Sequence, residues 1–179
     1  FDLFKCGYVV PLHADIIIKP NEDGSGFQVK AASSHFFVKH QGIKFLAKPP
    51  WAADFIVKID TGWRVIAPKG VKFLMLPIAY PDTFNFTPAM GILDPAASTQ
   101  VNFQMFWNEK DGEEIVIPAG TPLGHLIPLS EKKYQMVQRI MNQHDHDWIE
   151  KTTSMRNSTF WTYSKRKKIF DLYTKHWKR

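Results

Sequence analysis

A chain of 179 residues can bury roughly two thirds of the surface that it exposes when unfolded, so it needs neither a disulfide nor a metal to hold a core. Its single cysteine, Cys6, excludes an internal disulfide. The net charge of +6 is unevenly placed, because from Glu131 onward 12 Lys and Arg face 5 Asp and Glu, whereas the preceding residues carry 11 against 12. The sequence therefore predicts a nearly neutral domain over residues 1–130 and a basic tail over residues 131–179.

Two further expectations follow from the composition. We expect Cys6 to be a small buried hydrophobe, with a reactive thiol as the alternative. No apolar run reaches the ~18 residues that a membrane-spanning helix needs. We therefore expect a cytoplasmic or virion-associated protein that does not span a membrane.

Short alternating or β-branched runs predict strands through the first half of the chain. In chain order the expected strands are 8–12, 15–19, 27–30, the ambiguous run 35–40, 55–59 and 63–66. Asn21–Gly26 predicts a hairpin loop, and Thr61–Gly62 predicts a turn between the last two strands. Residues 80–88 have an irregular pattern and are the best candidate for a surface binding loop.

The clearest strand pattern lies within residues 90–129. In 100–107, Val101, Phe103 and Met105 alternate with polar residues, which predicts a half-buried strand whose far end, Phe106–Trp107, is covered on both faces. A charged loop ending in Asp-Gly predicts a hairpin to a short strand at 115–117. A proline-containing turn then leads to an apolar strand at 123–129.

A second copy of this strand-turn-strand unit occurs fifty residues earlier. The run Val65–Pro77 aligns with Ile115–Pro128, so that Pro68 and Gly70 fall on Pro118 and Gly120. Two copies indicate a pseudo-symmetric sandwich or barrel. A chance match is the alternative, because strand-turn-strand units resemble one another.

Two segments resemble the trimeric dUTPase and dCTP deaminase superfamily. They are Gly91-Ile-Leu-Asp-Pro95 and Ile117-Pro-Ala-Gly-Thr-Pro-Leu-Gly-His-Leu-Ile127. The resemblance implies a β-clip or jelly-roll-like body and would place Asp94 near the deoxyribose and the attacking water. The sequence departs from the family where Ala97 replaces a sugar-stacking aromatic and His125 replaces a glutamine, and it lacks the Arg-Ser-Gly phosphate-binding segment. The chain is also similar to uncharacterised proteins of phage and marine bacteria, a likeness that names no chemistry.

From Ser130 the apolar spacing becomes helical. Tyr134, Val137, Ile140 and Met141 fall on one stripe, which predicts an amphipathic helix with Ser130 as its N-cap. Residues 143–147 are expected to loosen that helix, and a second helix is expected to begin at Ser164.

The tail combines cations with aromatics at helical spacing. Its candidate partner-binding residues are Trp161, Lys165, Arg166, Lys167, Lys168, Tyr173 and Trp177. Cations in the first turn of a helix oppose its dipole, so they point to an anionic partner rather than to helix stability. We favour an arm that packs on another subunit, with nucleic acid bound through phosphate neutralisation and stacking as the alternative.

Catalytic and metal-binding motifs are not found in the sequence. His144 and His146 are two residues apart, which places them on different sides of a helix, and we interpret them as a solvated linker. His13, His35, His40 and His125 are scattered and do not form the paired pattern of a cupin metal site; His125 is expected to be a hydrogen-bonded strand residue. The sequence predicts no cofactor and no metal.

These observations predict a mainly β protein, a β-clip or jelly-roll-like sandwich or barrel over 1–130, with a basic amphipathic helical extension over 131–179. We expect a non-enzymatic binding or assembly module, such as a phage structural or accessory protein, that forms homo-oligomers or binds a protein partner through its tail. One alternative is a divergent dUTPase-like enzyme that binds or hydrolyses nucleotides at Asp94. A second alternative is a cupin-like metalloenzyme.

Overall fold

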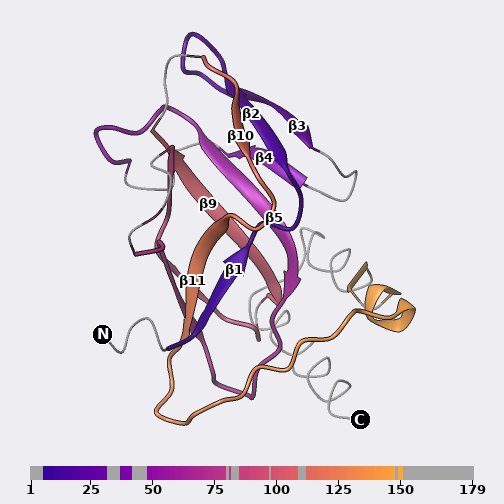
Figure 1. Cartoon of the computed structure of the whole chain (residues 1–179). Coiled ribbons are helices and arrows are strands. Elements are labelled where there is room, and N and C mark those ends of the chain that lie inside the picture. The colour runs from indigo at the N-terminus through magenta and orange to yellow at the C-terminus, as the bar shows by residue number, and fades with distance from the viewer. Residues whose placement is uncertain are drawn as a thin grey trace, which may run out of the picture. The chain divides into compact units, whose positions relative to one another are not determined.

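The computed structural model describes residues 6–31, 37–41, 48–79, 81, 85–96, 98–108, 112–147 and 149–150, with the side chains of 31 and 37–41 left out. Its strands all lie between residues 8 and 128, and they confirm the mainly β prediction (Figure 1). They are β1 (Tyr8–Pro11), β2 (Ile16–Pro20), β3 (Phe27–Ala31), β4 (Phe37–Gln41), β5 (Ile56–Arg64), β6 (Phe73–Leu76), β7 (Phe86–Pro88), β8 (Gly91–Leu93), β9 (Gln100–Trp107), β10 (Ile115–Ile117) and β11 (Pro122–Pro128).

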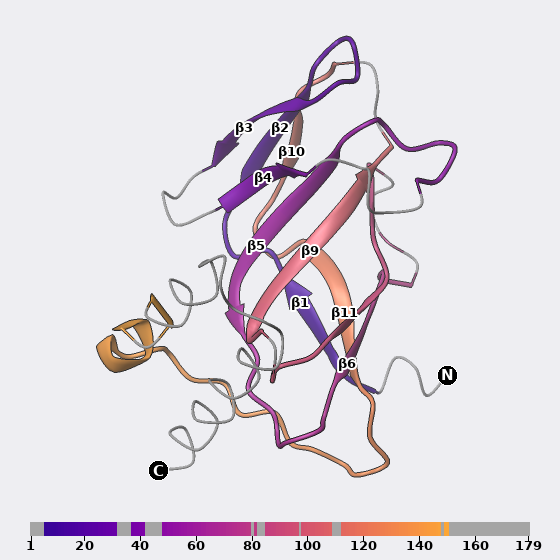
Figure 2. The same cartoon turned by 180° about the vertical axis from the view of Figure 1, so that it is seen from behind.

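The described strands form three antiparallel sheets, none of which closes into a barrel. Sheet A has the order β1-β11-β6-β8, sheet B the order β10-β2-β3, and sheet C the order β4-β5-β9-β7. Figure 2 shows β6 beside β11 at the back of the view in Figure 1. The open sheets leave β1, β8, β10, β3, β4 and β7 as edge strands within the described part of the chain.

A two-stranded ribbon links sheets A and B. In sheet A, β1 pairs with β11, and in sheet B the continuations β2 and β10 pair with each other. The crossing is fixed by backbone hydrogen bonds from Leu12 N–H to the Thr121 carbonyl (2.9 Å) and from Gly120 N–H to the Leu12 carbonyl (2.7 Å). The carboxylate of Asp15 also accepts the N–H of Ala119 at 2.7 Å. Both segments of the ribbon, β1–β2 and β10–β11, therefore pass from one sheet to the other at the same level, beside Leu12 and Gly120.

The predicted hairpin between residues 100–107 and 115–117 is wrong. β9 pairs with β5 on one side and β7 on the other, so neither of its edges is open to β10. β10 pairs with β2 in another sheet instead. The loop between β9 and β10 is consequently a crossing between sheets.

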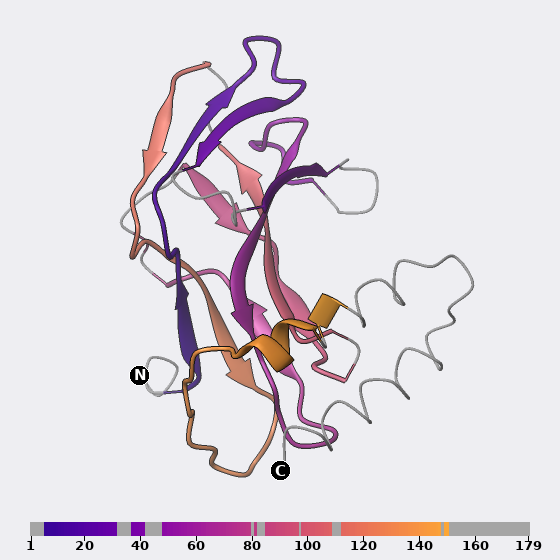
Figure 3. The ribbon, with the colours of Figure 1, turned by 90° about the vertical axis from the view of Figure 1, so that its right-hand side faces the viewer.

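Sheets A and C pack face to face around the core. Figure 3 shows β1 and β11 in one layer beside β5 and β9 in the next. The contact is close at Gly124 of β11, which lies against the ring of Phe103 in β9. Register pairs Ile59 with Phe103, and both side chains are fully buried. The alternation read in the sequence of β9 therefore places its apolar side chains in the core, as predicted.

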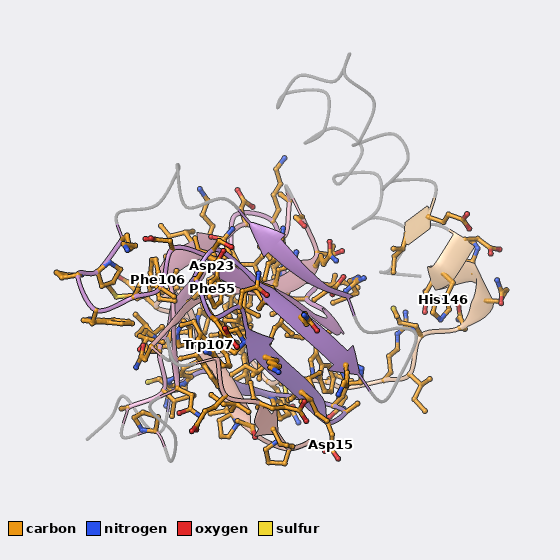
Figure 4. The ribbon with its side chains drawn as sticks, turned by 90° about the horizontal axis from the view of Figure 1, so that it is seen from above. Asp15, Asp23, Phe55, Phe106, Trp107 and His146 are labelled. Carbon is orange, nitrogen blue, oxygen red and sulfur yellow. The ribbon has the colours of Figure 1, made fainter. Side chains whose placement is uncertain are left out.

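The far end of β9 is covered on both faces, as expected. Phe106 is 8% exposed and Trp107 is fully buried, although successive residues of a strand point to opposite faces. Trp107 stacks on Phe86 with ring centroids 6.1 Å apart, and Phe106 meets Trp51 edge to face. Figure 4 shows Phe55, Phe106 and Trp107 together within the body.

The expected turn at Thr61–Gly62 is wrong, because β5 continues through it to Arg64. The register against β9 shifts between Asp60 and Arg64, as at a β-bulge, and Gly62 has a φ of +74°. A bulge commonly places glycine in this left-handed conformation. Thr61 fixes the bulge, since its hydroxyl donates to the Val101 carbonyl at 2.7 Å.

The two copies of the sequence repeat share their turn geometry. Gly70 and Gly120 have φ values of +88° and +86°, and in each turn an N–H bonds back to the proline carbonyl, of Pro68 or Pro118. The strands that follow, β6 and β11, are antiparallel neighbours in sheet A. The copies differ before the turn, because β10 has no counterpart at residues 65–67.

The chain divides into two compact units. The first comprises Phe1–Val65, Phe73–Leu93 and Gln100–Pro128, and the second comprises Ile66–Lys72, Asp94–Thr99 and the chain from Leu129 onward. All the described strands belong to the first unit.

The helix expected to begin at Ser130 is not formed. Residues 133–142 have no regular structure, and residues 143–147 and 149–150 are helical. Asn142 and Asp145 explain the start: the Asn142 side chain accepts the Asp145 N–H at 3.0 Å, and the Asp145 carboxylate accepts the Asn142 N–H at 2.9 Å. This reciprocal pair is of the capping-box kind, so the segment expected to loosen a helix is itself helical.

Candidate interaction surfaces

The outer face of sheet A is apolar. Register across the sheet places Val9, His125 and Leu76 in one row, and Ile127, Leu74 and Ile92 in another. The opposite face carries the buried core residues Val10, Phe73, Leu93 and Leu126. An antiparallel sheet with one solvated face normally alternates apolar and polar side chains. Here five of the six residues in the outward rows are aliphatic as well.

The five aliphatic side chains of these rows, which we name the sheet A patch, are Val9, Leu74, Leu76, Ile92 and Ile127. Val9 is 53% exposed and Ile92 63% exposed, and the other three are half-buried. His125 shares the face, but it is buried and its Nε2 bonds to the backbone carbonyl of Cys6. This contact confirms His125 as a hydrogen-bonded strand residue.

A cavity of about 380 Å³ lies in the first unit, where the edges of two sheets approach it. Its walls include β7 of sheet C and the end of β10 with the turn that follows it. Pro81, Asn85 and Phe86–Pro88 line it, so described residues of the predicted binding loop 80–88 do meet a cavity. The rest of the lining consists of Pro77, Ile78 and the residues from Val116 to Leu123, for which the sequence predicts strands and a turn rather than a binding loop.

Asp94 forms a turn after β8. Its carboxylate accepts the Ala96 N–H at 3.0 Å, its backbone carbonyl accepts the Ser98 N–H at 2.9 Å, and its Oδ2 lies 3.7 Å from Lys72 Nζ. These contacts give Asp94 a local structural role. Ala97 lies outside the described residues, and the nucleotide role of Asp94 stays a prediction.

The other sequence-predicted binding residues, Trp161, Lys165–Lys168, Tyr173 and Trp177, all lie outside the described residues. His144 and His146 are on the helical residues, where Figure 4 labels His146. Within the described part of the chain, no three His, Cys, Asp or Glu side chains are arranged to hold a metal ion.

Cys6 differs from the expectation. It is an exposed free cysteine rather than a buried hydrophobe. The reason is its position: it precedes β1, where its backbone carbonyl bonds to His125 while its side chain points away from the core.

A polar cluster lies where β5 meets the start of β9. Asp60 pairs with Arg64 at 3.4 Å, and Asp60 also accepts a hydrogen bond from the Gln100 side chain. Gln100 binds Asp60 Oδ2, whereas Asp60 Oδ1 accepts the Gly62 N–H at 3.1 Å. The Asp60 carboxylate therefore has partners on both oxygens, and the cluster closes the bulge.

Comparison with known proteins gives no family for the chain: no protein-family model matches it, and no curated protein is similar enough to count as a match. In the described part of the chain, no helix has the length and the apolar character that crossing a membrane requires.

Proposed function

We propose that the protein is a non-enzymatic assembly module that associates with further copies of itself. The sheet A patch is the observation that carries this proposal. Contiguous apolar surface of this kind is typical of protein interaction sites. Two of its five side chains, Val9 and Ile92, are more than half exposed.

A second copy is the occupant that best fits the chemistry of the patch. None of its five side chains is charged, so a partner needs no complementary charge to bind the patch. The same patch on two copies can meet about a two-fold axis, because an apolar surface is complementary to itself. Val9 and Ile92 stand at opposite edges of the sheet, on β1 and β8, so such a contact would extend across all four strands.

The finer architecture that we propose is an open β-clip or jelly-roll-like body. It is supported by the ribbon of β1–β2 and β10–β11 that passes from one sheet to another, and by the packing of sheet A on sheet C. Folds of this class join two sheets by strands that continue from one to the other.

The proposal is tested by measuring the mass of the full chain by light scattering over a concentration series. We expect an oligomer, and we expect Ile92→Lys to raise its dissociation constant by about a hundredfold, because the interface would then bury a charge. Ile66→Lys is the matched control, since Ile66 is also exposed (39%) but lies outside sheet A. A wild-type chain that stays monomeric into the millimolar range would overturn the proposal.

A further inference from the structure

Among the described residues, none that lines the cavity between β7 and β10 carries a charged side chain. Prolines and aliphatic or aromatic side chains dominate its lining, which includes Ile78, Phe86, Ile117 and Leu123, and its polar members are Asn85 and the threonines Thr87 and Thr121. A lining of this composition suits an apolar occupant that brings no net charge.

The cavity also lies beside two sheet edges. β10 ends sheet B and β7 ends sheet C in the described part of the chain. On either side of β7, the Asn85 carbonyl accepts the Asn108 N–H and the Ala89 N–H donates to the Gln104 carbonyl of β9. Because inward and outward residues alternate in an antiparallel strand, the N–H and C=O of Phe86 and the C=O of Pro88 point away from β9. Such an edge pairs readily with an extended segment.

The same chain presents an exposed apolar segment without regular structure. Residues 134–141, which we name the arm, have neither helix nor strand. Met136 is 57% exposed, Val137 83% and Ile140 94%. The three side chains therefore have most of their apolar surface exposed. The one charged side chain of the arm, Arg139, is bound by the Asp145 carboxylate through contacts of 2.6 and 3.2 Å.

We propose that the arm of one copy lies in the cavity of a second copy, along the edges of β7 and β10. This inference rests on the proposed self-association and adds a second contact between the copies to that of the sheet A patch. The arm supplies exposed apolar side chains, and the cavity supplies an apolar lining beside the outward backbone groups of β7. An extended stretch of eight residues spans up to about 28 Å, several times the length of the three-residue strand β7.

Cross-linking tests the contact directly. In a full-length Cys6→Ser background, one chain carries Val116→Cys on β10 and a second, differently tagged chain carries Val137→Cys on the arm. After mixing and mild oxidation we expect a covalent heterodimer. Gln28→Cys is the matched control for Val116→Cys, since both residues are exposed on edge strands of sheet B and Gln28 lies outside the sheet A patch and the cavity lining. Equal yields from the two would overturn the inference.

The energetic contribution of the arm is tested by removing its apolar side chains. We expect the double variant V137S/I140S to raise the dissociation constant by about tenfold or more. The variant Q135S/Q138S changes two polar residues of the same arm and should leave the dissociation constant unchanged.

Three outcomes separate the two proposals. A monomeric wild type overturns both. If the chain is an oligomer whose dissociation constant is unchanged by V137S/I140S, and no V116C–V137C heterodimer forms, only the proposed contact of the arm is overturned. A V116C/V137C double variant that closes a disulfide only within one chain also overturns the arm, because the segment then covers its own cavity.

Discussion

Gly124 of β11 lies directly against the ring of Phe103 in β9, with no room for a side chain between them. A Cβ at position 124 would overlap the ring, coming within 2.7 Å of Phe103 Cζ. Phe103 is fully buried and belongs to sheet C, whereas Gly124 belongs to sheet A. The missing side chain at 124 therefore sets how closely the two sheets approach.

We predict that Gly124→Ala lowers the free energy of unfolding by about 1–3 kcal/mol, the usual cost of overpacking a core. Chemical denaturation monitored by tryptophan fluorescence measures it. Gly91→Ala is the matched control, because Gly91 is also in a strand of sheet A and a Cβ there meets no atom within 4 Å. Equal stability of the two variants would show that the sheets can separate without cost.

The strand β9 could be predicted from the sequence because its signal is local. Val101, Phe103 and Met105 alternate with polar residues, and alternation alone decides which side chains face the core. The partners of β9 could not be predicted in the same way. They depend on β5 and β7, which occupy both of its edges, and this information is spread over fifty residues of chain.

The start of the C-terminal helix illustrates a competition between two local signals. The apolar stripe of Val137 and Ile140 predicts a helix, but a stripe stabilises a helix only where another surface covers it. Both side chains are exposed, so that stabilisation is missing here. Reciprocal capping by Asn142 and Asp145 starts the helix later instead.

The sequence predicts only one of the two walls of the cavity beside β7 and β10. The irregular composition of residues 80–88 indicated a binding loop. The facing wall, from Val116 to Leu123, reads as an ordinary strand and turn. That wall reaches the cavity because β10 belongs to sheet B. The position of β10 is fixed by its pairing with β2, about a hundred residues away in the sequence.

Thr61 provides a second test of the core. Its side chain is 1% exposed, its hydroxyl donates to the Val101 carbonyl at 2.7 Å, and it accepts the Trp63 N–H at 3.3 Å. We predict that Thr61→Val lowers the free energy of unfolding by about 1–3 kcal/mol, because buried backbone groups lose their partner. Thr61→Ser keeps the hydroxyl and should lose only about 1 kcal/mol for the methyl group. A Thr61→Val chain as stable as Thr61→Ser would contradict this role for the hydrogen bond.

Asp15 tests the crossing between sheets A and B. Its carboxylate accepts the Ala119 N–H at 2.7 Å across the ribbon. We predict that Asp15→Ala costs about 0.5–1.5 kcal/mol and speeds hydrogen exchange of the Ala119 amide. Asp15→Asn retains an acceptor oxygen and should protect that amide far better. If both variants exchange like the wild type, the contact does not hold the crossing.

Asp23 provides the pH-dependent test, in the hairpin loop that joins β2 to β3. The pKa of its carboxyl group is lowered below the ordinary aspartate value, first by the backbone N–H of Ser25 (2.9 Å) and then by the Ser25 hydroxyl (2.7 Å). A carboxyl group whose pKa falls on folding adds stability above its unfolded pKa, and that stability is lost as the pH falls through its folded pKa. The loop should therefore loosen on acidification below the ordinary range of aspartate.

A nuclear magnetic resonance titration of the Asp23 carboxyl carbon measures this shift directly. We predict that Ser25→Ala raises the pKa of Asp23 only part of the way to its ordinary value, because the larger cause, the backbone hydrogen bond, survives the substitution. Ser25→Thr keeps a hydroxyl and should leave the pKa close to that of the wild type. If the pKa of Asp23 in Ser25→Ala equals that of the wild type, the hydroxyl contributes nothing. If it rises fully to the ordinary value, the substitution has opened the loop and removed the backbone bond as well.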